Sequence, residues 1–172
     1  MSLWWFRAAP AVVRSMPLLP GDRRLAWSLT TDGDPVLASA YGLTLPGQGL
    51  AEWHLVEKAT WQRPALIVSL VDQQVIAAGS PAVVQGTGAS CTVQLVPGGN
   101  LPEVVRAKVT ESVVWSRHLQ WTEGGVRVVG RRQRGAAGLA WQLVYDQGTD
   151  VHDPGVQAAA GAALDAARQT VG

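Results

Sequence analysis

The stretch 50–71 constrains the fold more than any other part of the 172-residue chain. It reads LAEWHLVEKATWQRPALIVSLV, an amphipathic segment with two tryptophans followed by the apolar run 66–71. The polar tripeptide between them ends in Pro64, and proline interrupts a β-ladder because it lacks a backbone N–H. We therefore expect an antiparallel hairpin. In its first strand the alternation of inward- and outward-facing residues is interrupted between Leu55 and Ala59, which predicts a bulge or bend near Glu57.

Short segments of alternating apolar and polar residues flank this hairpin on both sides. Turn-forming pairs such as Asp32-Gly33 and Pro46-Gly47 separate them, and Gly42 is expected to mark a bulge. This spacing is typical of a meander that closes into a barrel or an orthogonal sandwich. With the hairpin included, about seven strands are expected in the first hundred residues. The strands outside the hairpin are expected at 25–29, 36–45, 75–78, 82–84 and 91–96.

A helix is expected to follow the last of these strands. Asn100 and Glu103 have the spacing of a capping box, which satisfies backbone donors at a helix start. Apolar residues then recur at helical spacing, so the helix over 101–113 should bury one stripe. One helix of this length can close the open end of a small β-roll.

The rest of the chain predicts a three-strand meander and a final helix. Asp153 can cap that helix, and Pro154 fits its first position because the missing N–H is not needed there. We therefore expect an α+β, β-rich fold, in which a seven-stranded antiparallel roll closed by a helix precedes the meander and the C-terminal helix. The strands of the meander are expected at 115–121, 126–132 and 139–145.

Composition narrows the class of protein. The hydrophobic share of 47% is ample for a packed core, and the formal charge of +1 favours no class of partner. The single cysteine, Cys91, excludes an internal disulfide and a multi-cysteine zinc site, and its alternating context favours a buried apolar role. No apolar run is long enough to span a membrane, and the N-terminus lacks the order of a signal peptide. We expect a soluble, cytoplasmic protein.

Three bulky side chains near the N-terminus, Trp4, Trp5 and Phe6, precede Arg7 and Arg14. We expect them to dock on the protein's own core. The alternative is peripheral contact with a membrane interface, where aromatic and basic side chains are favoured together.

Five segments carry a resemblance to a known family. On them the chain resembles an uncharacterised family of actinobacterial proteins with a pleckstrin-homology-like (PH-like) domain. The resemblance covers most of the chain from about residue 20 onward and implies a PH-like fold. Because Pro17 and Pro20-Gly21 indicate a turn or linker, we expect an N-terminal segment 1–20, a PH-like seven-stranded roll over 21–114, and an extension 115–172 packed on it or continuous with it. The resemblance implies a binding or assembly module and carries over no site residues. The segments are 20–27 (PGDRRLAW), 52–61 (EWHLVEKATW), 109–118 (VTESVVWSRH), 130–132 (GRR) and 141–146 (WQLVYD).

Catalytic motifs are absent from the sequence. The glycine-rich stretches lack the lysine or spacing of a phosphate-binding loop, and no Gly-x-Ser-x-Gly occurs. His54, His118 and His152 lack the spacing of a metal motif, and the first two are expected to be partly exposed strand histidines. We therefore assign no catalytic residue, no metal ligand and no cofactor.

Basic residues gather in the extension. Between residues 106 and 134 there are seven arginines and lysines against two acids. Arg127 and Arg131 share strand parity, so both are expected to point to solvent on one face, where guanidinium groups bind phosphate or carboxylate with two bonds each. The alternative is a solvated strand face with no ligand. The candidate anion-binding residues are Arg117, Arg127, Arg131, Arg132 and Arg134.

The leading hypothesis is a non-enzymatic binding or scaffolding module that recognises a protein segment or an anionic ligand. A strand edge can bind a peptide by β-augmentation. One alternative is an enzyme whose site is assembled from His54, Glu57, His118 and Asp146. Another is nucleic-acid binding through the arginines and an exposed tryptophan, which we do not favour.

Overall fold

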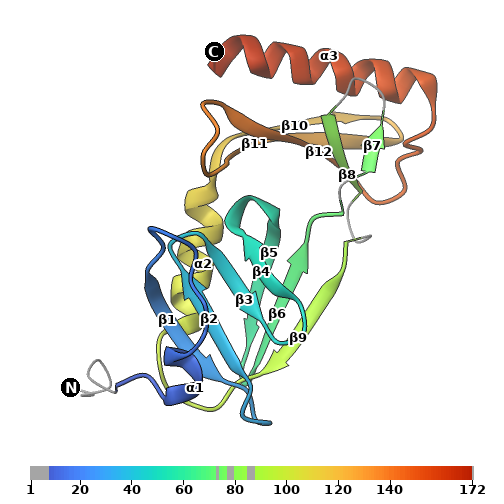
Figure 1. The fold of residues 1–172 in the computed structure, drawn as a ribbon. Coiled ribbons are helices and arrows are strands. Elements are labelled where there is room, and N and C mark those ends of the chain that lie inside the picture. The colour runs from blue at the N-terminus through green and yellow to red at the C-terminus, as the bar shows by residue number, and fades with distance from the viewer. Residues whose placement is uncertain (1–7, 73, 77–79, 85–87, 172) are drawn as a thin grey trace. The chain divides into compact units, whose positions relative to one another are not determined.

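The computed structural model describes residues 8–72, 74–76, 80–84 and 88–171. The chain forms two compact units. Unit 1 comprises Met1–Leu70 and Ser90–Glu111, and unit 2 comprises Val71–Ala89 and Ser112–Gly172. Antiparallel sheets dominate both, and a long helix ends the chain, so the prediction of a strand-rich α+β fold is confirmed (Figure 1). None of the described helices is both long and apolar enough to cross a membrane.

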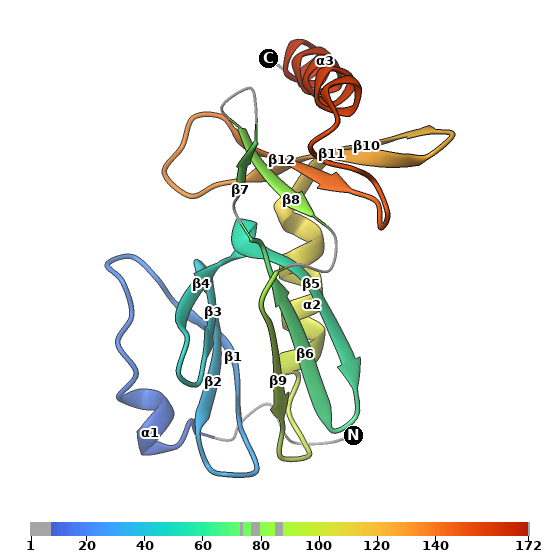
Figure 2. The ribbon, with the colours of Figure 1, turned by 90° about the vertical axis from the view of Figure 1, so that its right-hand side faces the viewer.

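Unit 1 holds two antiparallel sheets. The first is a meander of four strands in chain order, and a short 3-10 helix, η2 (Trp53–Leu55), leads from it to the second. The second has three strands in the order β5-β6-β9. Figure 2 shows the two sheets with α2 (Leu101–Ser112) running alongside them. The strands are β1 (Arg24–Leu29), β2 (Pro35–Ser39), β3 (Gly42–Leu45), β4 (Gly49–Glu52), β5 (Val56–Gln62), β6 (Ala65–Leu70) and β9 (Ser90–Gln94).

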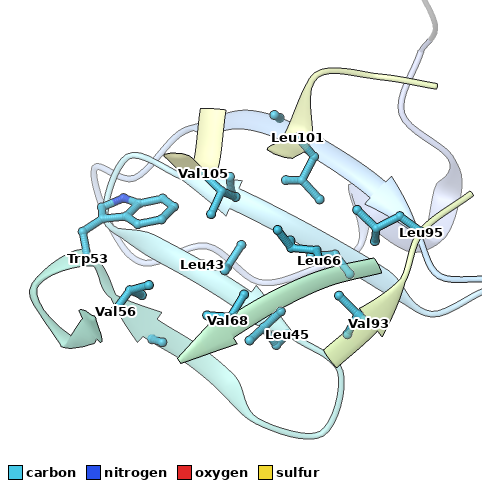
Figure 3. Packing of buried hydrophobic residues seen from close by; sticks show 14 residues of the cluster. Leu43, Leu45, Trp53, Val56, Leu66, Val68, Val93, Leu95, Leu101 and Val105 are labelled. Carbon is cyan, nitrogen blue, oxygen red and sulfur yellow. The ribbon is translucent and has the colours of Figure 1, made fainter. Parts of the chain in front are cut away.

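The core of unit 1 lies between the two sheets and α2. Side chains from β3, β6, β9 and α2 point toward one another there (Figure 3). Leu101 and Val105 of α2 are fully buried in this cluster with Leu43 and Val68, which confirms that the predicted helix closes the core. Burying one such side chain contributes about 1.5–3 kcal/mol. A short helix, α1 (Ala11–Arg14), contacts β2 and carries the buried Val13, which is not part of this cluster.

The predicted single strand over 36–45 is wrong, because the chain turns between β2 and β3. Ser39 makes this turn: its Oγ donates to the carbonyl of Gly42 and accepts from the N–H of Gly42, both at 3.2 Å. Gly42 marks a close approach, not a bulge, since a Cβ there would overlap the carbonyl oxygen of Ala51. The bulge predicted near Glu57 is confirmed by a register shift between Val56 and Lys58.

The predicted strands at 75–78 and 82–84 do not belong to the roll. Their counterparts, β7 (Gln74–Ile76) and β8 (Ser80–Val84), join the sheet of unit 2, where β8 runs parallel to β12 (Leu139–Tyr145). Residues 77–79 lie outside the described part of the chain. The two sheets of unit 1 are joined without these strands: β6 pairs directly with β9, and Thr30, which follows β1, bridges to Leu95, which follows β9.

Unit 2 is a five-stranded sheet with a helix on one face. Its order is β10-β11-β12-β8-β7, so β10 and β7 form its edges. The helix α3 (Pro154–Val171) buries Ala160, Leu164 and Ala167 against the sheet (Figure 1). The predicted cap is confirmed: Asp153 Oδ1 accepts from the backbone N–H of Val156 at 3.0 Å. The meander consists of β10 (Val113–Trp121), β11 (Gly124–Arg132) and β12 (Leu139–Tyr145).

Candidate functional site

Arg131, one of the five arginines expected at an anion site, lies in the interior, with only 5% of its surface exposed. Its Nη1 donates a 2.7 Å hydrogen bond to Ser112 Oγ, and its Nε donates to Gln142 Oε1 at 3.2 Å. The prediction that Arg131 and Arg127 are both exposed is therefore wrong for Arg131. A buried guanidinium must be hydrogen-bonded because it stays charged, and these two side chains supply two of its acceptors.

The other four arginines are exposed but do not gather on one face. Arg127 alternates with two valines of the core beneath α3, so its side chain points to the opposite face. Arg117 lies opposite one of those valines in the ladder, which places it on the α3 side. Arg132 ends β11, and Arg134 follows in the next loop. The five candidates therefore do not form a single anion site.

His118 and Asp146 meet on the face of the sheet opposite α3. The imidazole Nε2 lies 2.8 Å from Asp146 Oδ2, and each side chain is about one third exposed, 35% for His118 and 33% for Asp146. The two side chains meet over Gly125, where a Cβ would overlap Asp146 Oδ2 and lie 3.0 Å from His118 Nε2. A residue without a side chain on the middle strand thus allows the contact. The prediction of a partly exposed strand histidine is confirmed at this position.

A histidine held by a carboxylate is a component of many general-base sites. Within the described residues, however, the imidazole of His118 hydrogen-bonds to Asp146 alone, so it engages no serine or cysteine nucleophile. Of the four residues in the enzyme alternative, His54 and Glu57 belong to unit 1. His118 and Asp146 meet within unit 2, and the sequence separation of 28 residues concealed that pair.

The prediction that His54 is a partly exposed strand histidine is wrong. The residue lies in the 3-10 helix η2, not in a strand, and is only 7% exposed. Its Nδ1 is 3.4 Å from Glu52 Oε2. This contact is typical of a buried polar side chain that has a partner, and it points to a structural role.

The described tryptophans are all buried or half-buried, from Trp27 to Trp141. The nucleic-acid alternative therefore lacks an exposed aromatic platform in the described part of the chain. The predictions for Trp4, Trp5 and Phe6 concern residues outside that part. Across the described ranges, no three His, Cys, Asp or Glu side chains are grouped as metal ligands.

Strand β5 is an open edge of unit 1. Among the described strands it pairs with β6 alone. The hairpin turn has two residues, so the flanking pair Gln62 and Ala65 is hydrogen-bonded, and the pattern alternates from there. The backbone N–H and C=O of Ala59 and Trp61 consequently point away from β6. The side chains of the same two residues are only partly buried against the core.

A scan against protein-family models, a search of curated proteins and a search of solved structures gave no match to this chain. The function therefore has to follow from the geometry of the two units themselves.

Proposed function

We propose that the chain is a non-enzymatic binding module whose unit 1 is PH-like and binds an extended protein segment along β5. The observation that carries this proposal is the open β5 edge, beside which the core of the roll is incompletely covered. A PH-like identity is supported by the order of elements, with a four-strand meander, a three-strand sheet and a helix that closes the core. A protein segment is favoured over an anion because the candidate arginines are divided between two faces and the interior.

An added strand would gain two kinds of interaction at β5. The outward N–H and C=O groups of Ala59 and Trp61 offer up to four hydrogen bonds, each contributing about 0.5–1.5 kcal/mol. Side chains on the inner face of the added strand would also cover the exposed parts of Ala59 and Trp61. Each Å² of apolar surface removed from water contributes about 25 cal/mol.

The charges along this edge indicate what kind of segment fits. Lys58 and Arg63 are exposed on β5 and its turn. Lys58 lies next to Ala59, so an acidic residue in the bound segment would sit near a positive charge. We therefore propose a segment that alternates apolar with polar residues and carries at least one Asp or Glu.

Selection from a displayed library of ten-residue peptides tests the proposal. The peptides that bind are expected to alternate apolar and polar residues and to include acids. The variant Ala59→Pro removes an outward N–H and leaves the ladder to β6 intact, because proline is tolerated at a strand edge. It should weaken binding at least about tenfold. The matched control, Ala59→Ser, keeps the donor and should bind nearly as well as the unaltered chain.

Three results would contradict the proposal. The first is a library that yields no binder. The second is a set of binders that Ala59→Pro and Ala59→Ser affect equally. The third is binders that depend on arginines of unit 2, such as Arg127, which would favour the anion-binding alternative.

A further inference from the structure

Strand β10 is a second open edge and belongs to unit 2. It is nine residues long, and within the described part of the chain it pairs only with β11. Val114 is 45% exposed at its start. Long unprotected edges of this kind are templates for pairing with another chain, because they present a row of free backbone donors and acceptors.

The direction of the backbone groups follows from Gly125 on the neighbouring strand. Its carbonyl accepts from the N–H of Asp146, and its N–H donates to Thr149 Oγ1, so both groups point toward the β12 side. Gln120, which lies opposite Gly125, therefore has no backbone hydrogen bond to it. Because the pattern alternates, the N–H and C=O groups of Ser116, His118 and Gln120 point away from β11, toward the open side.

Apolar side chains accompany this row of backbone groups. Trp115, Leu119 and Trp121 point to the α3 face and are only partly buried against the core of unit 2. Trp115 already contacts Trp141 edge to face, with ring centroids 5.7 Å apart. Another strand beside β10 would cover the remaining exposed surface of these three side chains.

We propose that this edge pairs with the same edge of a second copy of the chain, β10 against β10, antiparallel about a twofold axis at His118. In this register the outward-pointing residues form the hydrogen-bonded pairs His118–His118 and Ser116–Gln120. Trp115 lies opposite Trp121 of the other copy, in a pair without backbone hydrogen bonds, where side chains approach most closely. The strand is thus complementary to itself over 115–121.

Two registers on the N-terminal side of this one, with the axis at Arg117 or at Ser116, are less favourable. An axis at Arg117 would place two guanidinium groups directly opposite each other, and like charges in that position are destabilising. An axis at Ser116 would bring Val114 into the ladder, where a register shift between Val113 and Trp115 breaks the regular pairing. With the axis at His118, the two imidazoles lie opposite each other instead, and each already contacts the carboxylate of Asp146 in its own chain. The register centred on His118 avoids both conflicts.

Disulfide trapping tests this register, in a Cys91→Ser background so that no other thiol is present. Hydrogen-bonded antiparallel pairs have Cα atoms about 5.5 Å apart, within reach of a disulfide. A mixture of Ser116→Cys and Gln120→Cys chains should therefore form a cross-linked dimer on mild oxidation. Either variant alone should not, because identical residues would be about 14 Å apart along the strand. His118→Cys should cross-link to itself.

Sedimentation supplies the second measurement. The unaltered chain should show a dimer that dissociates on dilution. Gln120→Pro removes an outward N–H without touching the β11 ladder, and it should raise the dimer dissociation constant at least about tenfold, whereas Gln120→Ala should leave it nearly unchanged. A monomer at every concentration up to about 1 mM, which is the dissociation constant of a very weak complex, would overturn the proposal. Cross-linking of Ser116→Cys to itself would overturn the register.

Discussion

Arg131 Nη1 donates a 2.7 Å hydrogen bond to Ser112 Oγ, and both residues are buried at 5% exposure. The contact joins the last residue of α2 to β11 within unit 2. It changes the role expected of Arg131 from ligand binding to structure. The hydroxyl of Ser112 and the amide oxygen of Gln142 both depend on the guanidinium for these hydrogen bonds.

Arg131→Ala should lower the free energy of unfolding by about 3 kcal/mol or more, because it leaves two buried polar groups without this donor and opens a cavity. Chemical denaturation followed by circular dichroism measures the change. Arg127→Ala, at an exposed position of the same strand, should change stability by less than about 0.5 kcal/mol. Equal effects of the two substitutions would contradict the structural role of Arg131.

Gly125→Ala should separate His118 from Asp146. The new Cβ would overlap Asp146 Oδ2 and lie 2.8 Å from the carbonyl of Leu119, so the strand must shift or the side chains must rotate away. We expect a loss of about 1–3 kcal/mol and a changed chemical shift of the His118 ring. Gly138→Ala is the control, since nothing lies within 4 Å of its Cβ, and it should leave that shift unchanged.

Gly161→Ala should stabilise unit 2. The glycine lies inside α3, and its Cβ would meet nothing within 4 Å apart from the helix's own backbone. Alanine is better in a helix interior than glycine by about 0.5–1 kcal/mol, so the melting temperature should rise by a few degrees. A fall in the melting temperature would show that this face of α3 is covered.

Tyr145 should make the protein less stable in alkaline solution. Burial in the apolar core of unit 2 raises the pKa of its phenol above the ordinary value of 10.0, because the phenolate is poorly solvated there. The folded state therefore favours the neutral phenol. The resulting contribution to the free energy of unfolding is fully present below pH 10.0 and is lost as pH rises through the higher folded pKa. Tyr145→Phe should remove this part of the alkaline loss, measured as the unfolding free energy from pH 8 to about 11.

Local patterns in the sequence predicted the elements better than their partners. Alternation and turn residues located β10, β11 and β12, and Asp153 with Pro154 marked the start of α3. The same alternation predicted strands at β7 and β8 but could not show that they join unit 2, because a period of two is identical whichever sheet receives the strand.

At the candidate site, too, the local pattern predicted part of the arrangement and missed the part that depends on tertiary contacts. Strand parity correctly assigned Arg127 and Arg131 to one face of β11, yet only one of them is exposed, because parity does not say what covers a face. The pairing of His118 with Asp146 depends on registers across three strands and on the absence of a side chain at Gly125. Neither fact is available from the spacing of the residues along the chain.

Amide hydrogen exchange, read residue by residue in unit 1 with a selected peptide added, tests the binding of a segment along β5 most directly. The N–H groups of Ala59 and Trp61 point away from β6 and should exchange readily in the free chain. Peptide binding is predicted to slow their exchange at least about tenfold, while Thr60, which bonds to β6, changes little. Protection that appears elsewhere and leaves Ala59 and Trp61 unchanged would contradict the account.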